Sequence, residues 1–67
     1  MKTRIAELRR QQKLSQEDLA QAVGVTRQTI TSLEVGKYTA SLVLAHNIAR
    51  FFQLTIEDIF LFEEEDL

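Results

Sequence analysis

The sequence has no cysteine, no proline and no tryptophan, and only two of its 67 residues are glycine. Without cysteine there are no disulfides, and a chain of this size buries only about 60% of the surface that it exposes when unfolded. Its stability must therefore come from economical helix packing or from a partner subunit. The scarcity of glycine and proline, with 45% apolar and 27% charged residues, is typical of a compact helical protein and excludes a disordered or collagen-like chain.

Long apolar runs are also missing, since no stretch approaches the roughly 18 residues that a membrane span needs. The segment from Met1 to Glu7 carries charges where a signal peptide needs an apolar stretch. There is no linker, repeat or internal boundary. We therefore expect one domain over residues 1–67, in the cytoplasm and without membrane contact.

Metal-binding and catalytic patterns are absent as well. His46 is the only histidine, and it has no cysteine or suitably spaced carboxylate with which to bind a metal. No nucleophile with a base, and no glycine-rich phosphate loop, can be recognised. We therefore expect neither an enzyme nor a cofactor.

Charge is unevenly distributed along the chain, although the net charge is only −2. Residues 1–56 hold all eight basic and four acidic side chains and so carry +4, whereas residues 57–67 hold six acidic side chains and carry −6. This pattern indicates a basic body that attracts phosphate and an acidic end that avoids it. The simpler alternative is that the acidic tail, residues 61–67, serves solubility alone.

Apolar periodicity and capping residues predict five short helices and an all-α fold. The first helix falls within 3–13, the second follows Ser15 and ends at Gly24, and the third follows Thr26 and runs to Glu34. Ser41 caps a helix over 42–52, and Thr55 caps a short last one. The segment 60–62 is too short to be assigned to helix or strand.

The helix over 42–52 carries two apolar stripes. Its predicted core stripe is Leu42, Ala45, Ile48, Ala49 and Phe52, and a second, adjoining stripe contains Leu44, Ile48 and Phe51. A helix in a monomeric protein rarely needs two apolar stripes. The second stripe therefore favours a partner subunit.

The most informative stretch, residues 16–35, predicts two helices joined by a tight turn at Gly24. Small Ala20 allows the helices to approach closely, while Ile30 and Leu33 hold the second helix on the first. Glutamine can bond adenine bidentately and arginine guanine, while serine and threonine suit either base, so a helix that displays them without an acid fits the DNA major groove. The residues left facing outward are Thr26, Arg27, Gln28, Thr31 and Ser32.

Three segments, Ser15–Ala20, Gly24–Ile30 and Glu34–Tyr38, resemble the Cro/repressor-type helix-turn-helix family, also called the XRE family. The resemblance runs from about Ile5 to Phe60 and is closest to very small bacterial regulators. It implies a compact lambda-repressor-like domain of five helices.

The resemblance also implies roles for individual residues. Arg27 and Gln28 occupy base-reading positions, with Thr26, Thr31 and Ser32 beside them. Arg9 and Glu34 match a buried salt bridge of the family. Two departures stand out: Thr39-Ala40 replaces a common Asn-Pro, and Gln53 replaces a glycine, which predicts a helix end that is either strained or differently built. The DNA backbone is expected to meet Gln16, Lys37, Tyr38 and Ser41.

These observations predict a sequence-specific regulator of double-stranded DNA, a repressor, that acts as a homodimer on a palindrome with helix 26–34 in the major groove. The acidic tail is expected to face away from DNA and to temper non-specific binding. The alternative is a protein-interaction module, such as an antitoxin or coactivator-like adaptor, that keeps the fold as a scaffold for a protein effector. The expected dimer interface comprises Leu44, Phe51, Ile56, Ile59, Leu61 and Phe62, with a short extended segment near the chain end.

Overall fold

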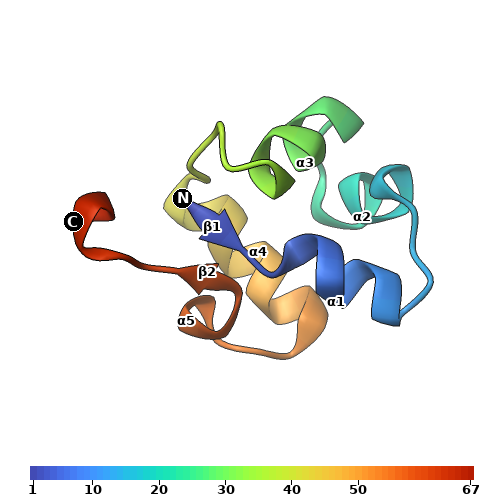
Figure 1. The fold of residues 1–67 in the computed structure, drawn as a ribbon. Coiled ribbons are helices and arrows are strands. Elements are labelled where there is room, and N and C mark those ends of the chain that lie inside the picture. The colour runs from blue at the N-terminus through green and yellow to red at the C-terminus, as the bar shows by residue number, and fades with distance from the viewer.

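The computed structural model describes all of residues 1–67 and is mostly helical, as predicted (Figure 1). α4 runs through the middle of the molecule, α2 and α3 lie side by side, and the N-terminus lies against the loop that follows α3 (Figure 1). The helices are α1 (Ile5–Gln11), α2 (Gln16–Val23), α3 (Arg27–Glu34), α4 (Leu42–Phe52) and α5 (Ile56–Ile59), followed by a 3-10 turn at Glu64–Asp66.

The predicted helix starts are confirmed by their caps. The side-chain oxygens of Ser15, Thr26, Ser41 and Thr55 each accept a hydrogen bond from the backbone N–H three residues later. These bonds satisfy amides that the first turn of a helix leaves without a partner. α2 ends at Gly24, which adopts the left-handed conformation with φ of 78°.

α4 ends at Gln53 in the left-handed conformation, with φ of 59°. For a side chain with a Cβ this conformation costs about 1–2 kcal/mol, whereas glycine adopts it without that cost. Of the two alternatives predicted for this helix end, the strained one is therefore confirmed.

The two ends of the chain form a small sheet. The short extended segment expected near the chain end is present at Phe60–Leu61, but the sequence did not predict its pairing with the start of the chain. β1 (Lys2–Thr3) pairs antiparallel with β2 (Phe60–Leu61), so Thr3 lies opposite Phe60. The first helix was expected within 3–13, but residue 3 belongs to the strand and the helix starts at Ile5. A two-residue strand has no periodicity of its own, and its pairing depends on a segment far away in the sequence.

The core draws on every helix, and α4 contributes the most residues to it. On α4 two predictions were wrong. Leu42, predicted in the core, is 79% exposed, and Leu44, predicted to face a partner subunit, is buried. Leu42 shares a face with Ala45 but lies at the first residue of the helix, at the edge of an open groove. The largest fully buried side chains are Ile5, Leu19, Ile30, Leu33, Ile48 and Ile59.

Candidate nucleic-acid interface

α2 and α3 form the two-helix unit that the sequence predicts, packed on each other across the turn at Gly24. Ala20 is fully buried, so its small side chain lets the helices approach. Its carbonyl accepts a hydrogen bond from the N–H of Val25 at 3.0 Å, which closes the turn. Ile30 and Leu33 hold α3 in the core, and the orientation of its outer face is thereby set.

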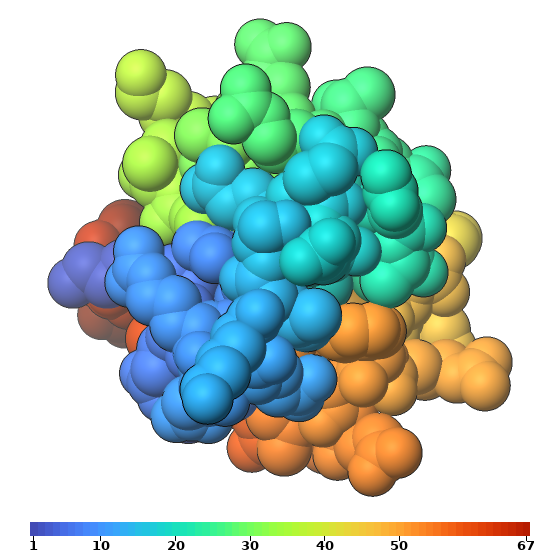
Figure 2. Space-filling view, turned by 90° about the vertical axis from the view of Figure 1, so that its right-hand side faces the viewer, coloured from blue at the N-terminus to red at the C-terminus, as the bar shows by residue number.

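The N-terminal part of α3 presents its side chains to solvent. Thr26, Arg27 and Gln28 are exposed, and Thr31 and Ser32 are half-buried. In the view of Figure 2 the side chains of this helix project from the top of the molecule, beyond α2. The helix is therefore free to enter a groove in a partner.

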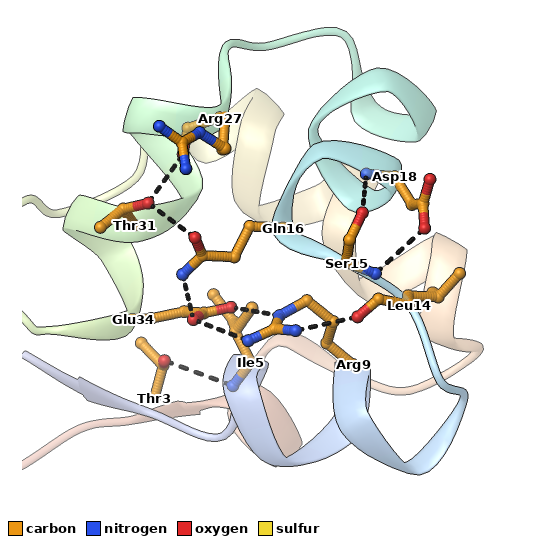
Figure 3. Close-up of polar contacts among 10 residues, drawn as sticks. All are labelled: Thr3, Ile5, Arg9, Leu14, Ser15, Gln16, Asp18, Arg27, Thr31 and Glu34. Carbon is orange, nitrogen blue, oxygen red and sulfur yellow. Dashed lines mark hydrogen bonds and ion pairs between the residues drawn. The ribbon is translucent and has the colours of Figure 1, made fainter.

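Polar contacts inside the protein use only some of these side chains. Thr31 is engaged, because its hydroxyl donates to Gln16 Oε1 and to the carbonyl of Arg27, both at 3.1 Å (Figure 3). The side chains of Arg27, Gln28 and Ser32 have no hydrogen bond or ion pair within the protein, so their polar groups are available to a ligand.

Beneath this surface, Arg9 and Glu34 form an ion pair, with Arg9 Nε 2.8 Å from Glu34 Oε2 (Figure 3). Arg9 also donates to the carbonyl of Leu14 at 2.8 Å. Gln16 Nε2 donates to Glu34 Oε1 at 3.0 Å, so Gln16 lies between the ion pair and Thr31. One N–H of Gln16 is left for an external acceptor, and the residue braces α3 at the same time.

The surroundings of Glu34 favour its ionised form. Burial raises the pKa of Glu34, but hydrogen bonds from Arg9 and Gln16 and the positive charges of Arg9 and Arg10 outweigh it, so the pKa lies below its ordinary value. The hydrogen bond to Glu34 raises the pKa of Arg9. Both groups are therefore ionised at neutral pH.

The loop after α3 carries the residues expected to meet phosphate. It turns at Gly36, with φ of 81°, and the N–H of Lys37 donates to the carbonyl of Ser32 at 3.0 Å. Lys37 and Tyr38 are exposed, whereas the Ser41 hydroxyl caps α4. The loop is thus anchored to the C-terminal end of α3.

A polar cleft of about 260 Å³ lies between α3 and this loop. It brings Tyr38 together with residues of α3, and among these is Thr29, to which the sequence did not assign a role. The signal that could have found Thr29 is its three-residue spacing from both Thr26 and Ser32, which places it on their face. The lining residues are Thr26, Gln28, Thr29, Ser32 and Tyr38.

The residues expected at a dimer interface do not form one surface. Leu44 and Ile59 are buried in the core, where a second copy cannot reach them, so placing them on that interface was wrong. Phe51 is half-buried and lines a groove with the end of α2. Ile56 and Phe62 line a different, apolar groove of about 230 Å³.

That apolar groove contains residues that the sequence analysis missed at this surface. Besides Ile56 and Phe62, it is lined by Met1 and Leu42, and no charged side chain contributes to it. Leu61 is 37% exposed and Phe62 49% exposed. The exposure of Leu42 depends on where α4 begins relative to the neighbouring elements, so periodicity could not reveal it.

The acidic tail lies beside the first strand. Glu63 forms an exposed ion pair with Lys2 at 3.4 Å. Glu65 and Asp66 line one side of an open cleft whose other side includes Val35 and Gly36. The tail is therefore on the side of the molecule where the chain leaves α3 for the loop.

Taken together, the tight turn, the buried brace and the outward helix of unpaired polar side chains define a helix-turn-helix protein, whose second helix is of the kind that enters the major groove. No helix in the structure is long and apolar enough to cross a membrane.

Comparison with known proteins agrees with this class. Residues 5–59 match the helix-turn-helix family, and the chain belongs to that family, in its XRE (Cro/repressor) type. It is an HTH-type, DNA-binding transcriptional regulator and not an enzyme.

The chain is similar over its whole length to small regulators of archaea and bacteria. It is 57% identical to an uncharacterized HTH-type transcriptional regulator of Archaeoglobus fulgidus, covering 100% of this chain and 94% of that one. It is 47% identical to the uncharacterized HTH-type transcriptional regulator YgzD of Bacillus subtilis, covering 98% and 100%. The resemblance to bacterial regulators thus extends to archaeal ones.

Two solved structures share the fold. The restriction-modification controller protein C.AhdI from Aeromonas hydrophila is 33% identical, with a TM-score of 0.77 over 85% of this chain and 86% of that one. SinR, in a complex of the SinR and SinI proteins, has a TM-score of 0.78 at 20% identity, over 96% of this chain and 63% of that one.

Proposed function

We propose that this regulator is a repressor that binds a palindromic DNA operator as a homodimer, each copy acting as a single domain in the cytoplasm. The observation that carries the proposal is the outer face of α3, where Arg27, Gln28 and Ser32 are unpaired and no acid interrupts them. Such a face pairs with base edges and does not repel phosphate.

Base reading falls to the exposed first half of α3. Gln28 offers the amide pair that fits adenine, and Arg27 offers the guanidinium that fits guanine. Thr26, Thr31 and Ser32 provide hydroxyl groups beside them. Because Thr31 is held by Gln16, it acts chiefly by fixing the position of the helix.

Contacts to the DNA backbone flank the reading helix. Lys37 provides a positive charge, and Tyr38 and the remaining N–H of Gln16 provide neutral donors. The N-terminus of α4 at Ser41 adds free backbone amides. These contacts set orientation and general affinity, and sequence preference comes from α3.

Support for the homodimer comes from the apolar groove, which is lined by residues such as Met1, Leu42, Ile56 and Phe62. A two-fold interface places each surface against itself, so a second copy can cover a patch that has no charged side chains without like-charged side chains meeting at its centre. A dimer would then present two copies of α3 to half-sites about one helical turn, or 34 Å, apart.

The alternative function is a protein-interaction module. The exposed apolar side chains Leu42 and Val43 favour it, because a different protein could cover them as well as a second copy could. Stoichiometric co-purification of such a protein, together with no preference among DNA sequences, would support this alternative over the repressor.

Selection of bound sequences from random duplex DNA tests the proposal. We expect enrichment of one palindromic sequence whose half-sites are about 10 base pairs apart from centre to centre. An enriched sequence without two-fold symmetry would contradict the homodimer, and no enrichment would contradict sequence-specific binding.

A reporter gene tests the direction of regulation. With the selected sequence overlapping a promoter, expression of the regulator should lower reporter output. The matched control is Gln28→Ala, which alters the reading helix at an exposed position and should leave output high. A rise in output with the unaltered protein would identify an activator instead.

A further inference from the structure

The cleft between α3 and the Tyr38 loop has a chemistry of its own. Its lining consists of four residues with hydroxyl groups and one amide, and no charged side chain lines it. The strongest bonds to phosphate are charge-assisted, and this cleft has no cationic side chain to form them. Its chemistry suits the uncharged edge of a base, whose donors, acceptors and methyl groups are read by such side chains.

Thr29 is held differently from its neighbours in the cleft. Its Oγ1 lies 3.2 Å from Thr26 Oγ1, in a hydrogen bond between the two hydroxyls, and its backbone N–H donates to the same Thr26 oxygen at 3.3 Å. A side-chain hydrogen bond of this kind restricts χ1, and with it the position of the γ-methyl group. The bond to Thr26 occupies one hydrogen-bonding position of the Thr29 hydroxyl and orients the side chain, including its γ-methyl group.

Gln28 lines the same cleft and has a free amide that fits adenine. A threonine methyl in protein–DNA interfaces contacts the C5 methyl of thymine. We propose that Thr29 is a specificity-determining residue whose γ-methyl group contacts a thymine methyl beside the base that Gln28 reads. This inference rests on the proposed function, since it assigns part of the recognised sequence to one unassigned side chain.

The experiment removes the two methyl groups of the proposed contact separately, first that of the thymine and then that of Thr29. In the duplex selected above, each thymine is replaced in turn by deoxyuridine, which differs only by the missing C5 methyl. For the unaltered protein we expect the affinity to fall about fourfold at one thymine per half-site, the loss of one buried methyl contact.

Two variants separate the methyl from the hydroxyl. Thr29→Ser keeps the hydroxyl partner of Thr26 and removes the methyl, so it should bind the thymine and uracil duplexes equally. Thr29→Val keeps a methyl and removes the hydroxyl, so it should retain the preference for thymine. Thermal unfolding of both variants checks that α3 remains folded.

The outcomes distinguish the inference from the function on which it rests. A full thymine preference in Thr29→Ser would overturn the role of Thr29, as would a selected half-site in which no thymine methyl affects binding. A selection that enriches no sequence would instead contradict the proposed function, and the inference with it.

Discussion

Arg9 on α1 and Glu34 at the end of α3 form an ion pair with 2.8 Å between Arg9 Nε and Glu34 Oε2, and their side chains are only 11% and 6% exposed. The Arg9 guanidinium also donates to the Leu14 carbonyl, and Gln16 donates to Glu34. The start of α2 and the end of α3 are therefore fixed to α1 by one polar network. This network and the core together fix the orientation of α3.

Breaking the ion pair should destabilise the protein strongly. Arg9→Met leaves the carboxylate of Glu34 buried without its cation, and we expect the free energy of unfolding to fall by about 3–5 kcal/mol. Urea unfolding of the variant and of the unaltered protein measures this difference in the free energy of unfolding. Lys2→Met is the control, because it removes only the exposed pair with Glu63 and should cost less than about 1 kcal/mol. Equal losses of stability in the two variants would show that the buried pair contributes no more to stability than the exposed pair does.

Stability should fall in acid. Glu34 has a folded-state pKa below its ordinary 4.5, and capping hydrogen bonds from Ser15 and Thr55 hold the pKa values of Asp18 and Asp58 below 3.8. Carboxylates with lowered pKa values contribute stability that is fully present above about pH 5 and is lost as the pH falls through the folded-state values. Thermal unfolding between about pH 3 and pH 7 should show this loss below about pH 4.5. A melting temperature that rises on acidification would contradict it.

The left-handed residues at the ends of α4 and α2 predict that two substitutions change stability in opposite directions. Gln53→Gly removes the Cβ strain at φ of 59° and should stabilise the protein by about 0.5–1 kcal/mol, after the entropy that glycine adds to the unfolded chain. Gly24→Ala should destabilise it by about 1 kcal/mol, although an added Cβ there has open space around it, because its φ is 78°. Melting temperatures that move the other way would refute the conformational explanation.

The proposed dimer predicts a specific sensitivity to charge in the apolar groove. Phe62→Glu places a carboxylate in a surface that would face itself, so sedimentation should show a shift from dimer to monomer. Leu54→Glu is the matched control, because Leu54 is 37% exposed but does not line the groove. An unchanged dimer in Phe62→Glu would remove this groove from the proposed interface.

Local chemistry explains why most helices could be predicted. Ser15, Thr26, Ser41 and Thr55 cap their own helices through bonds that span three residues, and a sequence shows that spacing directly. The αL residue at Gly24 follows from the same local reasoning. The two helices and the turn between them could therefore be located from neighbouring residues alone.

The parts that could not be predicted depend on distant contacts. Leu42 and Leu44 sit two residues apart on one helix, and only the position of the neighbouring elements decides that the first is exposed and the second buried. The pairing of Thr3 with Phe60 likewise joins opposite ends of the chain. Thr29 could not be assigned from its neighbours in the sequence, because only the fold brings Tyr38 from the following loop to the same cleft.

The central claim, that α3 reads bases, is tested most directly by measuring the affinity of Gln28→Ala for the selected operator and for random duplex DNA. The claim predicts a loss of about 1–3 kcal/mol on the operator, almost none on random DNA, and relaxed preference at one base pair. Lys37→Ala is the contrasting variant and should weaken both DNAs alike, with the salt dependence reduced by about one counterion. An equal loss on both DNAs in Gln28→Ala would contradict base reading by α3.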